Sequence, residues 1–242
     1  MIGLAGVPEL EPGDDLGAIM ARACNDAGGL EEGDIVVVAQ KAVSKVEGRI
    51  VRLDEVTPSE RAIELAGDEG DPRQVEVILR ESVTVVRSRP PLVISQTRHG
   101  FVCASAGVDA SNAKGPGTVI LLPLDPDASA RALRERLHEL TGVAPGVIVS
   151  DSFGRAWRQG TTDVALGVAG LTPLRDLRGT QDRQGYELRS TMIAIVDEIA
   201  GAAELVMGKA NGVPAAIVRG VDALGDGRAV DLVMPRERDL FR

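Results

Sequence analysis

Short apolar runs alternate with longer segments of helical spacing along most of the chain. The apolar runs contain many β-branched residues, which is typical of strands that are buried on both faces. Buried strands are therefore predicted over 35–39, 118–122, 146–150 and 213–218, and strand 35–39 should be central in a sheet. Apolar residues recur every three or four positions elsewhere, which predicts helices over 16–27, 72–82, 128–141 and 191–207.

Shorter signals complete the predicted elements. The segment Thr57-Pro58-Ser59-Glu60 predicts the start of another helix, with the Thr57 hydroxyl as its cap and Pro58 at its first position. Segments 83–86 and 92–95 predict two strands joined by a turn. Strand-to-strand connections this short do not occur in a regular doubly wound sheet.

These elements predict a mixed α/β (α+β) fold, with mixed sheets and covering helices. A Rossmann or P-loop fold is not expected, because no glycine-rich phosphate loop follows a strand and opens a helix. We expect a single domain over residues 1–242, and two interleaved subdomains remain an alternative. A nucleotide site in such a fold would have to be assembled from several loops at strand ends.

Composition narrows the classes of function. Hydrophobic residues make up 44% of the 242 residues but aromatic residues only 2%, so the core must be aliphatic. So few aromatic rings argue against base stacking on an aromatic platform. A formal charge of −9 argues against nonspecific binding to nucleic acid or anionic membranes.

Cysteine usage and hydropathy predict the cellular location. Cys24 and Cys103 lie far apart and have no metal-binding spacing, which is typical of a reduced protein. No apolar run approaches the roughly 20 residues of a membrane span. We therefore expect a cytoplasmic protein.

The segment Asp151-Ser-Phe-Gly-Arg-Ala-Trp-Arg-Gln-Gly160 comes directly after the predicted strand 146–150 and gathers unusual chemistry. We expect a loop in which Asp151 and Ser152 bind a metal ion. Arg155 and Arg158 would face an anionic substrate. For the decapeptide alone, a turn capped by its aspartate, with solvated arginines, explains the same residues equally well.

Two further polar clusters come after predicted strands. Lys41, Lys45 and Arg49 come after strand 35–39 and could pair with phosphates, although a surface helix turn would also contain them. Asp109, Ser111 and Asn112 present oxygens that suit a hard cation or nucleotide hydroxyls, or simply a self-capped turn. We expect His99 to be a hydrogen-bonded structural histidine.

Together these blocks resemble one family, the coenzyme F420-0:L-glutamate ligases, also called gamma-glutamyl ligases of F420 synthesis. The resemblance covers essentially the whole chain, in the family's order, and none of its blocks is a widespread motif. The matching stretches are 6–16, 43–49, 106–112, 122–127, 151–160, 197–200, 207–209 and 213–214. The chain resembles the stand-alone form, without the flavin-binding extension of some relatives.

The resemblance implies a GTP-dependent ligase. Such an enzyme adds L-glutamate to the lactyl carboxylate of the deazaflavin precursor F420-0, and further glutamates through gamma linkages, releasing GDP and phosphate. GTP would activate the carboxylate as an acyl phosphate, with Mg²⁺ or Mn²⁺ and K⁺ as cofactors. The resemblance also implies an intertwined homodimer with sites near the subunit interface.

Family positions carry over to this sequence residue by residue. The metal-binding positions match Asp109, Asp151 and Ser152. Arg155 and Arg158 are assigned on their chemistry to F420-0 or glutamate, and no general base is identified. The GTP-binding positions match Val7, Pro8, Glu9, Leu10, Gln40, Lys41, Lys45, Asn112, Met207, Gly208, Lys209, Ala210, Asn211, Gly212, Val213 and Pro214.

One position departs from part of the family. Lys209 stands where some members have a metal-liganding acid, and an ammonium group cannot ligate a cation. The metal would then have fewer protein ligands, or Lys209 would touch phosphate directly, or Glu204 would replace the acid.

Two other classes of function remain alternatives. In a metal-dependent phosphohydrolase, Asp109 and Asp151 would hold the ion and water would be the nucleophile, so GTP would be consumed without glutamate. In a nucleotide-binding subunit without catalysis, the polar clusters would merely close turns, and Asp151→Ala would be tolerated.

Overall fold

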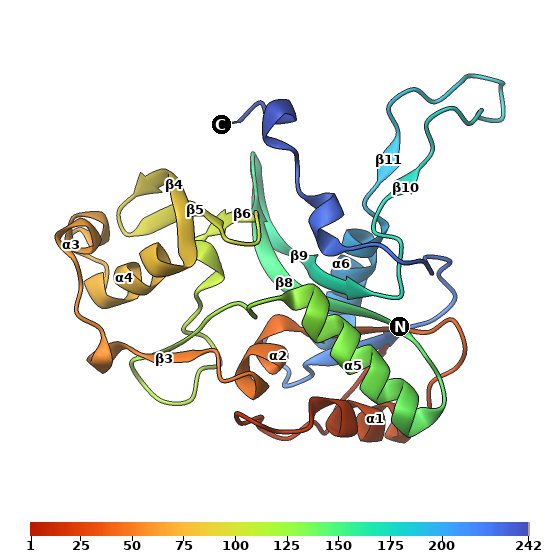
Figure 1. Cartoon of the computed structure of the whole chain (residues 1–242), viewed down its shortest axis with the longest axis horizontal. Helices are drawn as coiled ribbons and strands as arrows, with labels where there is room; N and C mark the ends of the chain where they lie inside the picture. The colour runs from red at the N-terminus through yellow and green to blue at the C-terminus, as the bar shows by residue number, and fades with distance from the viewer. Residues whose placement is uncertain (242) are drawn as a thin grey trace.

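A five-stranded mixed sheet lies at the centre of the computed structural model, which describes residues 1–241 (Figure 1). Its strand order is β1-β12-β2-β8-β9; β2 and β8 run parallel, and the other neighbours run antiparallel. The predicted mixed α/β fold is confirmed. Residue 242, the last of the predicted domain, lies outside the described residues. The strands are β1 (Ile2–Gly3), β2 (Ile35–Ala39), β8 (Gly146–Arg155), β9 (Arg158–Ala169) and β12 (Ala215–Val218).

Helices cover both faces of this sheet, which explains why β2 is apolar at every position. Val36 and Val38 pack with α1 (Leu16–Asp26), α2 (Gln40–Val46) and α5 (Pro126–Thr141) in one core. Ile35 and Val37 point to the opposite face and pack with α6 (Ile195–Met207). Side chains alternate along a strand, so a strand covered on both faces needs apolar residues at odd and even positions.

A smaller lobe is inserted between α2 and α5, at the left of Figure 1. It has its own aliphatic core, which includes Leu53, Val75, Ile78 and Val119. Whether this lobe and the main sheet form two interleaved subdomains stays a prediction. The lobe contains β3 (Ile50–Arg52), α3 (Glu60–Ala66), α4 (Pro72–Glu81), β4 (Ser82–Arg89), β5 (Leu92–Thr97), β6 (Val102–Ala104) and β7 (Thr118–Ile120).

Three predicted helix starts were wrong by a few residues, including that of the helix expected from 128, which begins at Pro126. The helix expected from Thr57 begins at Glu60, because Ser59 caps it by accepting a hydrogen bond from the Ala62 amide at 3.2 Å. The helix expected from 191 begins at Ile195. The residues before it form β11 (Met192–Ile193), which pairs with β10 (Arg175–Asp176).

The predicted loop over 151–160 was also wrong, because β8 continues through Asp151 to Arg155. It forms a long hairpin with β9, in which Ser152 lies opposite Asp163 and Arg155 opposite Arg158. The polar residues after Ser150 still extend the strand because β9 supplies backbone hydrogen bonds along its whole length. The hairpin tip lies beside the C-terminal segment, where the Trp157 and Phe241 rings are 4.8 Å apart.

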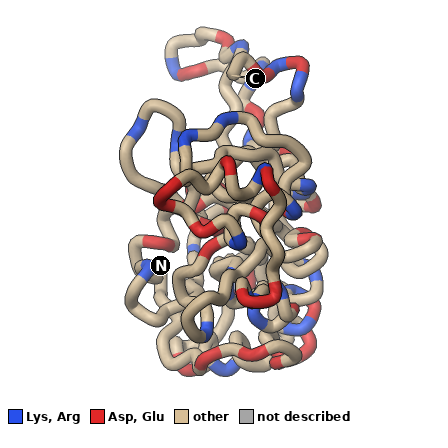
Figure 2. The backbone as a smooth tube through the Cα atoms, turned by 90° about the vertical axis from the view of Figure 1, so that its left-hand side faces the viewer, with Lys and Arg blue, Asp and Glu red and all other residues tan. Residues whose placement is uncertain are grey.

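Charged residues of both signs are interspersed along the chain (Figure 2). The net charge of −9 is therefore not gathered in one segment. Among residues 1–241, no helix is long and apolar enough to cross a membrane. The cytoplasmic location stays a prediction.

Candidate functional site

A cleft of about 330 Å³ opens where β2 ends, beside Ser150, Asp151 and Ser152 in the middle of β8. Five separate parts of the chain line it: the segment after β1, helix α2 with the end of β2, Asn112 in the loop before β7, the β8–β9 hairpin, and α6 with the turn after it. The lining residues are Val7, Pro8, Glu9, Leu10, Ala39, Gln40, Lys41, Ala42, Lys45, Asn112, Ser150, Asp151, Ser152, Asp163, Glu204, Met207, Gly208, Lys209, Ala210, Gly212, Val213 and Pro214.

The parallel pairing of β2 and β8 explains how distant polar segments meet here. Ala39 lies opposite Ser150 in the register. The next residues, Gln40 at the start of α2 and Asp151 on β8, therefore lie close to each other. Ligands of open α/β sheets commonly bind at the carboxyl ends of the strands. Lys41 and Lys45 are four residues apart on α2 and therefore share one face of the helix.

Lysine is concentrated in this cleft. The chain has four lysines, and Lys41, Lys45 and Lys209 line the cleft. The fourth, Lys114, lies outside the lining and pairs with Glu11. A local cluster of ammonium groups in an acidic protein suits a ligand with several phosphates, because lysine binds phosphate as a compact point charge.

Each of the two lysines on α2 contacts a carboxylate. Lys41 Nζ donates to Asp109 Oδ2 and to Ser111 Oγ, both at 2.6 Å, and Lys45 contacts Glu9. Burial opposes ionisation of Asp109, but Lys41 and Ser111 outweigh it and lower its pKa. The amide of Ser111 also donates to Asp109 Oδ1, so the predicted self-capped turn does form, and Asp109 does not line the cleft.

The Asp151 carboxyl group is more deeply buried than that of Asp109. Burial raises the pKa of its carboxyl group to about 7, opposed by the Ser152 amide and Lys41 and reinforced by Asp163 and Asp109. A cation beside this carboxyl group would favour its ionised form.

Asp163 is a cleft residue that the sequence alone did not indicate. It lies on β9 and is 4% exposed, and its carboxylate accepts hydrogen bonds from Ser150 Oγ at 3.0 Å and Ser152 Oγ at 2.6 Å. The only signal in the sequence is an acid at the start of an otherwise small and apolar segment. Without the hairpin register, nothing in the sequence places it beside Ser152.

The turn after α6 closes another side of the cleft. At Gly208, with φ +62°, a Cβ atom would lie 2.2 Å from the Asn211 side chain, so the turn requires glycine. Lys209 and Glu204 both line the cleft. Burial raises the pKa of Glu204, as does Asp163, whereas Lys209 lowers it. Among the predicted GTP-binding residues, Asn211 does not line the cleft.

The two arginines of the hairpin do not reach the cleft. Arg155 and Arg158 are exposed at the tip, and Arg155 donates to the Gln159 carbonyl at 3.3 Å. The cleft therefore contains only the first part of the predicted 151–160 site.

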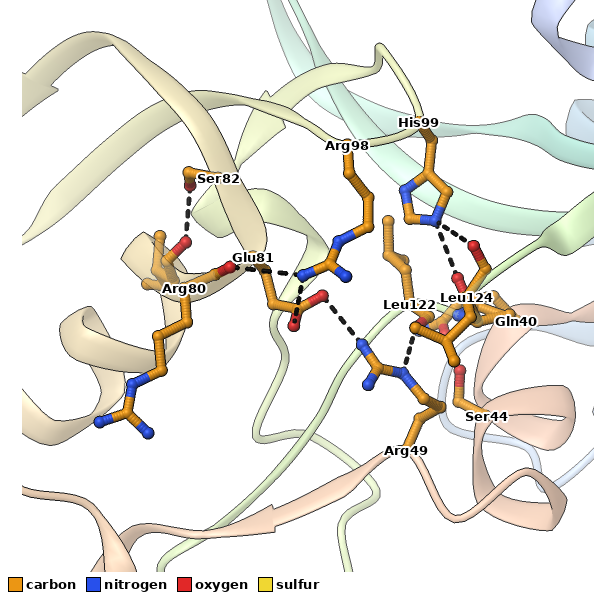
Figure 3. Close-up of polar contacts among 12 residues, drawn as sticks. Gln40, Ser44, Arg49, Arg80, Glu81, Ser82, Arg98, His99, Leu122 and Leu124 are labelled. Carbon is orange, nitrogen blue, oxygen red and sulfur yellow. Dashed lines mark hydrogen bonds and ion pairs between the residues drawn. The ribbon is translucent and has the colours of Figure 1, made fainter.

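Arg49 and His99 bind the segment that leads from β7 to α5, where the smaller lobe ends (Figure 3). Arg49 donates to the Leu122 carbonyl and to Glu81, both at 2.9 Å. His99 Nε2 lies 2.9 Å from the Pro123 carbonyl oxygen, as expected of a structural histidine. Neither side chain lines the cleft.

The donor atoms of the cleft suit a magnesium-type ion. Within residues 1–241, no three acidic, histidine or cysteine side chains are already placed to hold a metal. Mg²⁺, however, usually binds one or two carboxylates together with waters and substrate phosphates. Asp151 and Ser152 present such oxygens in the cleft, whereas Asp109 pairs with Lys41 outside the lining.

Comparisons with known proteins identify the family of the chain. Residues 6–220 match the family model for F420-0:Gamma-glutamyl ligase. The chain is 46% identical over 248 residues to the Coenzyme F420:L-glutamate ligase of Methanothermobacter thermautotrophicus, covering 100% of this chain and 98% of that protein. It is 48% identical over 241 residues to the Methanopyrus kandleri protein of the same name, covering 97% and 94%.

Proposed function

The chain belongs to the F420-0:gamma-glutamyl ligase family and joins L-glutamate to coenzyme F420-0, and we propose that GTP bound in the cleft drives this reaction. One observation carries the proposal. All predicted GTP residues except Asn211 line a single cleft, although they come from four separate segments of the chain. Asp151 and Ser152, two of the three predicted metal ligands, line the same cleft.

The proposed reaction has two steps. A carboxylate oxygen of F420-0 attacks the γ-phosphorus of GTP, the bond to the bridging oxygen breaks, and GDP leaves. The amine of glutamate then attacks the carbonyl carbon of the acyl phosphate and loses a proton. Phosphate leaves with one oxygen of the original carboxylate. Gamma-linked glutamates would be added by the same two steps.

The cleft residues provide charge and orientation for phosphoryl transfer. When GTP binds, the Lys41 side chain leaves Asp109 and the Lys45 side chain leaves Glu9, and both ammonium groups then neutralise the phosphates. Asp109, Asp151 and Ser152 would hold Mg²⁺ or Mn²⁺, which neutralises phosphate charge when bound. We propose that Lys209 touches phosphate directly and that Glu204 faces the cation, because both side chains line the cleft. A K⁺ requirement is proposed from the family resemblance.

The tip arginines are proposed to bind anionic groups of F420-0 or glutamate. Arg155 is four residues beyond Asp151 on β8, about 13 Å along an extended strand. An elongated substrate whose carboxylate lies beside the γ-phosphate could span that distance.

A homodimer is also proposed. Trp157 is 81% exposed and Leu240 91%, and with Phe241 they form an apolar group near the hairpin tip. Burying such a group between subunits would stabilise a dimer. Sedimentation equilibrium would test this, and a monomer at micromolar concentration would contradict it.

Isotope transfer tests the two-step reaction. The protein is incubated with GTP, Mn²⁺, L-glutamate and F420-0 labelled with ¹⁸O in its lactyl carboxylate. We expect a mass increase of one glutamate, with one ¹⁸O atom in the released phosphate. GTP hydrolysis that proceeds without glutamate and leaves phosphate unlabelled would contradict the proposal and favour a phosphohydrolase.

A further inference from the structure

Asp163 is a buried carboxylate whose negative charge has no basic partner among the described residues. It is 4% exposed, and its hydrogen-bond donors are the hydroxyls of Ser150 and Ser152. No ion pair involves it within residues 1–241. A buried charge is costly unless a cation or a metal compensates it, and two neutral hydroxyls do not.

The carboxylate fixes the direction of the Ser152 hydroxyl. A serine hydroxyl has one hydrogen to donate, and Ser152 gives it to Asp163 Oδ1 at 2.6 Å. The Ser152 oxygen can then either accept a hydrogen bond from a ligand or ligate a cation. It cannot donate to a phosphate. Because Ser152 and Asp163 lie opposite each other in the β8–β9 register, the hairpin itself fixes this direction.

Ser150 offers an internal comparison. It donates to the other oxygen of the same carboxylate at 3.0 Å but is 0% exposed. Ser152 is only partly buried and lies directly after Asp151. Both serines therefore satisfy Asp163, but Ser152 is the one with room for a ligand.

We propose that Asp163 is a positioning residue that turns Ser152 into a ligand for the divalent cation. This inference rests on the proposed function for the presence of that cation in the cleft. Asp163 holds the hydroxyl hydrogen away from the cleft and raises the electron density of the Ser152 oxygen. Carboxylates that orient metal ligands in this way commonly contribute about 10–100-fold to metal affinity.

Mn²⁺ binding to the full chain, followed by the electron paramagnetic resonance signal of free Mn²⁺ without nucleotide or substrates, tests the proposal. Asp163→Asn keeps the size of the side chain but removes its charge and one acceptor. We expect about 10–100-fold weaker Mn²⁺ binding, with an unchanged far-UV circular dichroism spectrum. Unchanged Mn²⁺ affinity in Asp163→Asn would overturn the proposal.

A double-mutant cycle separates positioning from charge alone. In the Ser152→Ala background, Asp163→Asn should change Mn²⁺ affinity by no more than about twofold. An equal loss in both backgrounds would show that Asp163 does not act through Ser152, and would overturn the proposal.

Two serine variants keep the test decisive if Asp163→Asn does not fold. Ser152→Ala should weaken Mn²⁺ binding, whereas Ser150→Ala should leave it within about twofold. Equal effects of the two variants would contradict the assignment. Because no GTP, glutamate or F420-0 is present, the outcome does not depend on the ligase reaction, which the ¹⁸O experiment tests separately.

Discussion

The two ends of the β8–β9 hairpin differ in burial, contacts and chemistry. At the cleft end, Asp151, Ser152 and Asp163 are buried or half-buried, and a short hydrogen bond joins Ser152 to Asp163. At the tip, Arg155 and Arg158 are exposed, and the contact of Arg155 with the Gln159 carbonyl is long. Both ends come from one polar stretch of the sequence, so proximity in sequence does not make one site.

The difference separates two kinds of function. Buried polar groups that are fixed in direction can bind a small, hard ligand with defined geometry. Exposed arginines can attract an anion but do not impose a geometry on it until it is bound. We therefore place metal and phosphate at the cleft end and the larger substrate toward the tip.

Removing the Asp151 carboxylate should have the largest effect. Asp151→Asn should lower ligase activity by more than about 100-fold, because a direct cation ligand should contribute more than the 10–100-fold typical of residues that only orient one. Glutamate addition is measured by mass, with Asp54→Asn in the smaller lobe as the control. Activity near that of the control would place the cation elsewhere.

Lys45→Met should weaken GTP binding by about 10–100-fold, because a hydrogen bond to a charged group is worth about 1.5–3 kcal/mol. Fluorescent GTP titration measures the affinity. Lys114→Met is the matched control, since Lys114 pairs with Glu11 outside the cleft lining. Equal effects of the two substitutions would mean that general charge, rather than the cleft, binds the nucleotide.

Lys41→Met should change two affinities in opposite directions. Removing the ammonium from Asp109 frees a carboxylate, so Mn²⁺ binding without nucleotide should tighten by about tenfold. GTP binding should weaken, because a phosphate partner is lost. Calorimetric titrations with each ligand measure both changes. A loss of both affinities would show that Lys41 supports the fold of the site rather than competing with the cation.

Substitutions at the hairpin tip should have the smallest effect on nucleotide binding. The double variant Arg155→Ala/Arg158→Ala should keep GTP affinity within about twofold, as expected for residues far from the ligand. Its KM for F420-0 or for glutamate should rise. A large loss of GTP affinity would remove the distinction between the two ends of the hairpin.

Hydrophobic periodicity predicted the buried strands, but it could not predict where a neighbouring strand extends them. Strand 35–39 was predicted with the bounds of β2, because its β-branched residues are buried on both faces. The strand predicted over 146–150 stopped too early, because the polar residues beyond Ser150 are held by β9 rather than by their own hydrophobicity.

The same limit applies to the site. The family resemblance indicated the cleft residues, but no residue pattern shows that Val7, Lys45, Asp151 and Lys209 line one cavity. The sequence did not indicate the role of Asp163, because that role comes from a cross-strand neighbour.

A crystal structure with Mn²⁺ and a non-hydrolysable GTP analogue would locate the cation and the phosphates in one experiment. We predict an anomalous manganese peak against the oxygens of Asp109, Asp151 and Ser152. Lys41 should be displaced from Asp109, and the analogue's phosphates should lie against Lys45. A manganese peak and phosphates outside this cleft, with the Lys41–Asp109 pair intact, would contradict the proposed site.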